Sequence, residues 1–405
     1  MALASNHEYQ RQSRWVELFD PEKYYPFVRL LSSYLTIADF LLLCQACKGL
    51  DVLKGFMLRK FSNINVRLRD FVDDPVMFRS QLGNYGALIS GPFALNIFEL
   101  GRHQVLYLDV FIKDGANADQ FTDYIQETEK YQNDNQKVET TPTRCIYSSC
   151  VRPGMKLRIT RTNGSPIRAI LTSTYTTACV NFITWNKAYS IFPQQTLINH
   201  QFYPLRSLDD GFGSNLNELA SQGWTTRNMI WPDLAGEEVG KIEGLRRVGD
   251  SSTLVILLNT DSIQAPSTPD FVIDYAQFDI SGSNWQNFYH PNRFSQSQSQ
   301  QLLGNTGTRN RFLKIQAEDM SLSAVRHSYT ISSSFWKSYV TERLRRWAWL
   351  ELYKLKSENR PLQSTDVYPL ISDVFIPQAF KMPRSWDFAD DQIPQWYHEW
   401  EAMNM

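Results

Sequence analysis

The alternation of hydrophobic and polar positions is clearest from Gly86 to Lys113, and we expect the rest of the chain to be organised around this stretch. The pattern predicts, in order, a buried strand, a glycine turn, a short apolar helix and an alternating strand. These elements are expected at 87–89, 90–92, 93–100 and 105–112. Gly91 stands in the turn, where a glycine allows the backbone to bend sharply or to approach another group closely.

The same patterns predict a mixed α and β core up to residue 205. Strands are expected at 64–68, 144–151, 155–160, 167–172 and 188–192, with the second and third forming a hairpin. Helices are expected at 75–82, 116–131 and 177–183. Asp73 and Asp74 precede the first of these helices, where acidic side chains favour the positive end of the helix dipole.

The second half of the chain is less regular. It predicts one buried strand at 253–258, a low-complexity linker at 295–301 and a long helix at 332–357. The arginines at 343, 345 and 346 are interpreted as a solvated face of that helix rather than as a nucleic-acid site. The proline-rich, aromatic tail at 361–405 is expected to pack back as irregular cover or a last short helix.

Composition narrows the class of protein. Of 405 residues, 42% are hydrophobic and 20% charged, which is typical of a globular chain. The net charge of −1 argues against a nucleic-acid partner. There is no apolar N-terminal run and no stretch near the roughly 20 apolar residues of a membrane helix. We therefore predict no membrane association. The odd number of cysteines, five, predicts free thiols and hence an intracellular location, in cytoplasm or nucleus.

The central stretch resembles the nucleotidyltransferase fold. That superfamily carries a glycine turn, a helix and a strand with two acidic residues that hold Mg²⁺, and a third acid on a later strand. Gly91 matches the turn and Asp109 the second acid, whereas Tyr107 stands in the slot of the first. Residues 87–95 (ALISGPFAL) and 176–189 (TTACVNFITWNKAY) also resemble an uncharacterised fungal family, over roughly 25–205.

The resemblance implies a metal-dependent transferase, but the chain departs from its pattern. The strand expected to carry the third acid offers Lys156 and Arg158 instead. Two cations would repel Mg²⁺ and attract an anion. The resemblance therefore predicts a non-catalytic protein without cofactor, which binds a protein partner or a nucleotide. The predicted ligand-binding residues are Ser90, Gly91, Asp109, Lys156 and Arg158. A divergent, active Mg²⁺ enzyme remains an alternative, with Asp109 joined by Asp114 or Glu99.

Residues 25–50 predict two amphipathic helices, at 25–35 and 36–50, and the second resembles a degenerate F-box. The matching positions are Leu35, Asp39, Leu41, Leu43, Cys47, Lys48 and Leu50. This resemblance implies a substrate adaptor of a ubiquitin ligase, with Leu35, Asp39, Leu43 and Leu50 binding the partner. The alternative is that the helices only pack on the following domain. Cys44 and Cys47 are interpreted as core thiols, since no further metal ligands accompany them.

Together these observations predict an α+β fold with a nucleotidyltransferase-like mixed sheet and flanking helices. An F-box-like helical segment precedes it, and a mixed, irregular C-terminal half with one long helix follows. The predicted divisions are 1–20 as a loose N-terminus, 21–62 as F-box-like helices, 63–205 as the core, 206–331 as an elaboration and 332–405 as the C-terminal helix and aromatic tail.

Overall fold

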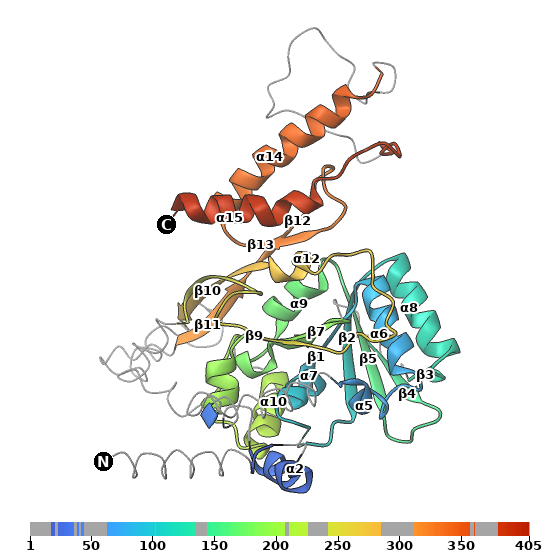
Figure 1. The fold of residues 1–405 in the computed structure, drawn as a ribbon, viewed down its shortest axis with the longest axis vertical. Helices are drawn as coiled ribbons and strands as arrows, with labels where there is room; N and C mark the ends of the chain where they lie inside the picture. The colour runs from blue at the N-terminus through green and yellow to red at the C-terminus, as the bar shows by residue number, and fades with distance from the viewer. Residues whose placement is uncertain are drawn as a thin grey trace, which may run out of the picture.

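A computed structural model describes most of the chain. The described residues are 18–20, 23–35, 39, 42–43, 63–101, 103–134, 144–206, 210–225, 242–284, 311–356, 360 and 380–404. They form a mixed α+β structure in which helices flank a large sheet (Figure 1). No helix in these ranges is both long and apolar enough to span a bilayer.

The large sheet has eight strands in the order β3-β4-β5-β2-β1-β6-β7-β9. These are β1 (Leu88–Ser90), β2 (Tyr107–Lys113), β3 (Tyr131–Asn133), β4 (Arg144–Ser149), β5 (Lys156–Thr162), β6 (Asn181–Ile183), β7 (Lys187–Ser190) and β9 (Leu254–Leu257). Strands β2 and β5 pair in parallel, and every other neighbouring pair in this sheet is antiparallel. The strand predicted at 105–112 and the hairpin at 144–160 are therefore confirmed.

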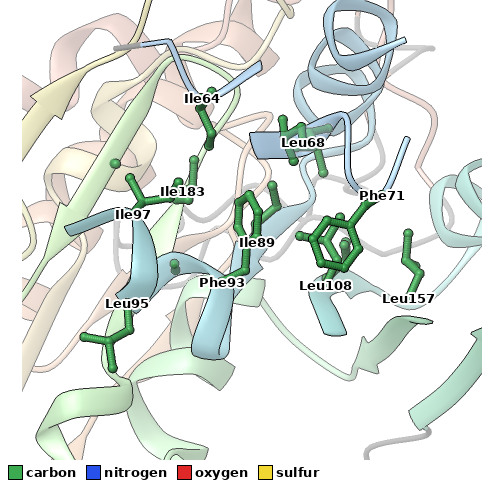
Figure 2. Packing of buried hydrophobic residues seen from close by; sticks show 14 of the residues in the cluster. Ile64, Leu68, Phe71, Ile89, Phe93, Leu95, Ile97, Leu108, Leu157 and Ile183 are labelled. Carbon is green, nitrogen blue, oxygen red and sulfur yellow. The ribbon is translucent and has the colours of Figure 1, made fainter. Parts of the chain in front are cut away.

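The first face of the sheet is covered by helices from the N-terminal half of the chain. These are α5 (Asn65–Leu68), α6 (Pro75–Tyr85), α7 (Gly91–Phe98) and α8 (Ala116–Glu127). Leu108, Val110 and Ile112 of β2 point to this face and are fully buried. Phe71 packs edge-on against Phe93 of α7, with ring centres 5.6 Å apart, in the cluster drawn in Figure 2. This cluster is the largest part of the core.

The second face of the sheet packs on α9 (Pro166–Ser173) and on a smaller sheet. That sheet has the order β11-β10-β8, formed by β8 (Gly244–Arg247), β10 (Gln277–Asn284) and β11 (Arg311–Gln316). The rings of Phe182 and Tyr189 stack here at 4.7 Å. Other connecting elements are α2 (Tyr25–Tyr34), α10 (Asp210–Ser221) and α12 (Phe271–Asp274), with a 3₁₀ turn at Thr177–Cys179 and a π-helical turn at Gln194–Ile198.

The C-terminal elements form a third cluster, drawn in orange and red in Figure 1. It contains β12 (Glu318–Met320), β13 (Tyr329–Ile331), α14 (Ser334–Tyr353), a 3₁₀ turn at Asp390–Gln392 and α15 (Ile393–Asn404). Trp336 of α14 packs on Tyr397 and Trp400 of α15, at 5.0 and 5.6 Å between ring centres. The long helix predicted at 332–357 and the last helix of the tail are therefore confirmed.

Two predicted strands are helices in the structure. Residues 64–68 lie in and before α5, where Ile64 and Leu68 are buried one helical turn apart. Residues 167–172 lie in α9, which begins with Ser165 as N-cap, its hydroxyl accepting from the amide of Arg168, and Pro166 at the first position. A short apolar run fits either type of element, and here the cap and the proline favour the helix.

Three other boundaries differ from the predictions. The helix expected at 177–183 is a 3₁₀ turn followed by β6, and the helix expected at 116–131 ends at Glu127. The strand at 253–258 is present as β9, but it is an edge strand and Leu257 is 70% exposed, so the prediction of a buried strand was wrong. Asp74 caps α6 as its position suggested, accepting from the amides of residues 76 and 77. The linker at 295–301 lies outside the described residues.

Candidate functional site

The register of three strands assembles the predicted ligand-binding residues at one end of the large sheet. Asp109 on β2 lies opposite Ser90 on β1 and beside Arg158 on β5. Because side chains alternate between the faces of a strand, Asp109 points away from the leucine-rich face and towards the side of Phe111. Four of the five predicted ligand-binding residues, including Gly91, therefore meet around one carboxylate.

Gly91 is required by how closely Asp109 approaches it. The backbone of Gly91 has a φ of +73°, in the region that side-chain-bearing residues rarely adopt. A Cβ placed on it would lie 3.1 Å from the Cγ of Asp109 and even nearer to its Oδ2, well inside van der Waals contact. The glycine that the sequence marked as a site of close approach is therefore in contact with the carboxylate.

The carboxylate of Asp109 is buried, with 2% of the residue exposed, and is held by two arginines. Arg158 donates to both of its oxygens, from Nε and from Nη2, in a bidentate pair. Arg144 on β4 approaches Oδ1 at 3.3 Å. The guanidinium of Arg158 also lies over the ring of Tyr107, 4.4 Å from its centre. A planar, doubly hydrogen-bonded pair of this kind fixes both side chains in position.

Lys156 lies on the same strand as Arg158 but pairs with a different acid. Its ammonium lies 3.2 Å from Asp134, nearer the surface, and it is the register partner of Tyr107. The hydroxyl of Ser148 and the charge of Lys156 lower the pKa of Asp134 below its ordinary value. Ser90 donates its hydroxyl to the backbone carbonyl of Asn181 at 2.8 Å and is 1% exposed, so it stabilises the sheet.

Arg144 is the site residue that the sequence did not reveal. It begins β4 and is the register partner of Thr160, which places it on the same face as Arg158. Its side chain is 41% exposed, so it is the most accessible of the site's arginines. The only available signal was a basic residue at the start of a predicted hairpin strand, which is common on any protein surface.

The additional acids considered for an active enzyme lie elsewhere. Glu99 pairs with His103 at 3.5 Å, and Asp114 pairs with Arg161 at 3.2 Å. Arg161 points to the opposite face of β5, where it also bonds Thr122 of α8. Within the described ranges no three histidine, cysteine, aspartate or glutamate side chains gather as a metal site would require. Among the described residues, the charged side chains that contact the carboxylate of Asp109 are therefore two arginines, Arg158 and Arg144, and no second acid.

The N-terminal helix α2 confirms the amphipathic element predicted at 25–35. Leu35 and Leu43, two of the predicted partner-binding residues, are partly buried against the first hydrophobic cluster. Asp39 is half-buried. Leu50, Cys44 and Cys47 lie outside the described residues, as do most of residues 36–62.

The arginines of α14 are engaged with acids and rings. Arg343 pairs with Glu399 at 3.0 Å and lies over the ring of Tyr339, while Arg346 pairs with Glu342. The indole of the neighbouring Trp347 donates to the carbonyl of Asp387 at 2.8 Å. This arrangement agrees with the interpretation as a solvated helix face.

Comparison with known proteins gives little beyond a partial likeness. No protein-family model matches the chain. No curated protein matches it at a significant level. Solved CCA-adding enzymes resemble part of it: one in complex with CTP, at 17% identity and a TM-score of 0.28, and one from Thermotoga maritima in complex with tRNA, at 18% and 0.27. The likeness covers 35% of this chain, and the chain spans 36–37% of the length of those enzymes.

Proposed function

We propose that this chain is a nucleotidyltransferase-like protein that has exchanged its metal site for an arginine–carboxylate pair and acts by binding rather than by phosphoryl transfer. The observation that carries the proposal is the bidentate contact of Arg158 with Asp109. Nucleotidyl transfer uses metal ions to neutralise phosphate charge and to activate the attacking oxygen. A guanidinium within hydrogen-bond distance of both oxygens puts a positive charge where such an ion would lie.

The same end of the sheet suits an anionic group. Among the residues that the structure describes, Arg144, Lys156 and Arg158 pair with two carboxylates there, those of Asp109 and Asp134. Arg144 and Lys156 are 41% and 36% exposed along their side chains, so both can reach a ligand at the surface. Guanidinium and ammonium groups are the usual protein partners of phosphate. The proposed ligand is the phosphate part of a nucleotide, bound without Mg²⁺.

The test is calorimetric titration of the full chain with ATP, in EDTA and in Mg²⁺, together with an assay for released pyrophosphate. We expect binding in EDTA, no turnover in either buffer, and an affinity about tenfold weaker in Arg144→Gln, which is the size of one exposed charge-assisted contact. Arg161→Gln is the matched control, because it removes the same charge from the opposite face of β5.

Two outcomes would contradict the proposal. Turnover by wild type that is lost in Asp109→Ala would identify Asp109 as a metal ligand and the chain as an enzyme. Equal loss of affinity in the Arg144 and Arg161 variants would mean that ATP responds only to the overall charge of the molecule.

A second candidate function is that of a ubiquitin-ligase adaptor, favoured by one face of α2. Phe27, Leu30 and Tyr34 recur at helical spacing and are 43%, 59% and 75% exposed. Large apolar side chains grouped in this way are typical of a protein-binding surface. The test is titration with the purified ubiquitin-ligase subunit to which F-box helices bind. We expect binding that Leu30→Asp abolishes. Leu350→Asp, at a similarly exposed position of α14, should leave binding intact. Binding that is unaffected by Leu30→Asp would exclude this face.

A further inference from the structure

A cavity of about 300 Å³ lies at the opposite end of the large sheet from Asp109. It opens where β1 begins and β2 ends, so Gly86, Leu88 and Lys113 all line it. Lys113 lies four positions after Asp109 on the strand, which is about 13 Å along β2. No residue of the anion site lines this cavity, so the two sites are separate.

The walls of the cavity come from all three hydrophobic clusters. Leu82 belongs to the first cluster, Ile167 and Tyr189 to the second and Val272 to the third. Trp185 and Pro266 add two flat surfaces close to Gly83, on which a Cβ would lie 3.2 Å from the indole and 3.1 Å from the proline ring. Flat apolar walls at the meeting point of several packing units are typical of small-molecule pockets.

The polar groups around the cavity are mostly cationic or neutral. Lys113 and Arg326 line it, and no carboxylate of the described residues forms an ion pair with either side chain. Arg326 instead lies over the ring of Phe388, 4.7 Å from its centre. The imidazole of His327 is half-buried, and burial lowers its pKa, so it is neutral near pH 7 and able to donate or accept one hydrogen bond.

The one acid on the lining, Asp270, is already engaged. It accepts from the side-chain amide of Asn186 at 2.7 Å and pairs with the ammonium of Lys187 at 3.0 Å. Lys187 also binds Asp274 at 2.7 Å, which in turn accepts from the hydroxyl of Tyr189. This network holds the floor of the cavity in place and leaves Lys113 and Arg326 as its available charges.

We propose that this cavity is a second ligand site, which binds a small flat organic anion: an aromatic ring system carrying one carboxylate. The ring system would lie between Trp185, Pro266 and Ile167, where it removes apolar surface from water. The carboxylate would lie towards Lys113 and Arg326 at the rim. A volume of this size accommodates one or two fused rings.

The experiment is calorimetric titration of the full chain with 2-naphthoate, 2-naphthamide and 2-naphthylmethylamine, which share a ring system and differ in charge. We expect 2-naphthoate to bind about tenfold more tightly than the neutral amide and the amine to bind most weakly. Lys113→Gln should reduce the preference for the acid severalfold, whereas Lys314→Gln, at an exposed lysine on β11 outside the cavity, should leave it unchanged.

A second variant tests the location. Thr268 lies half-exposed on the loop at the rim, so Thr268→Trp fills the cavity without disturbing a buried residue. It should abolish binding of all three probes while ATP binding at the other end of the sheet persists. Equal affinity of acid and amide, or unchanged binding in Thr268→Trp, would overturn the proposal, and so would the absence of 2-naphthoate binding at its solubility limit.

Discussion

Replacement of Gly91 by alanine tests how tightly the candidate site is built. Two costs are expected. A side chain at φ +73° strains the backbone by about 1–2 kcal/mol. Its Cβ would also displace the carboxylate of Asp109 from its buried pair with Arg158, and breaking such a pair costs about 3–5 kcal/mol when nothing replaces it. Because Arg144 stays within reach of a displaced carboxylate, we expect the lower end of both costs, a total loss of about 4 kcal/mol.

Gly86 provides the matched control. It has nearly the same backbone conformation, with φ +64°, but a Cβ there would meet nothing within 4 Å. Gly86→Ala should therefore cost only the backbone strain, about 1 kcal/mol. The difference between the two variants, about 3 kcal/mol, measures the contact with Asp109. Urea unfolding followed by near-ultraviolet circular dichroism gives both values from the shift of the midpoint.

A double variant separates the contact from any general weakness of the turn. In an Asp109→Ala background the carboxylate is absent, so Gly91→Ala should cost about as much as Gly86→Ala. If Gly91→Ala and Gly86→Ala destabilise equally in the wild-type background, the approach of Asp109 to Gly91 is not a constraint and the argument for this site's geometry fails.

Three further predictions concern other parts of the molecule. Asp74→Ala removes the N-cap of α6 and should cost about 1 kcal/mol in urea unfolding, with Asp74→Ser restoring most of it; no loss would refute the cap. Arg79 is 1% exposed, burial lowers its pKa to about 10, and it donates twice to the carbonyl of Trp185. Arg79→Leu should therefore lower the free energy of unfolding by about 2 kcal/mol, and Arg79→Lys should not restore it. Full restoration by lysine would show that the paired donation is unimportant. Burial lowers the pKa of His327 below its ordinary value of about 6.5, so near that pH the unfolded chain binds a proton that the folded chain does not. Acidification from pH 7 to 5.5 should therefore lower the free energy of unfolding more in wild type than in His327→Asn. Equal dependence of the two unfolding free energies on pH would refute this.

Some features of the fold follow from the sequence because the determining residues are near one another in the chain. The period of apolar residues over 20 positions fixes α14, and an aspartate before a proline fixes the start of α6. The alternating pattern of β2 and the β4–β5 hairpin were likewise readable, since each depends on local contacts. Gly91 was recognisable as a point of close approach, because few other reasons place a glycine between a buried strand and an apolar helix.

Other features depend on contacts between distant segments. Arg158 is 49 residues from Asp109, and only the parallel register of β2 and β5 makes them neighbours, while Lys156, two positions away, pairs with Asp134 instead. A local signal, by contrast, decides residues 167–172: their apolar run fits a strand, but the cap at Ser165 starts a helix there.

The sequence by itself determined that the chain is a mixed α+β protein and that Asp109, Lys156 and Arg158 are the charged residues on the strands predicted at 105–112 and 155–160, because residue type alone decides which charges are present. Only the tertiary structure decided where those charges meet, because a pairing energy depends on the distance between groups that the chain brings together by folding. The cavity between Trp185, Ile167 and Lys113 is the extreme case: its walls come from segments spread over most of the chain, and no local pattern marks any of them.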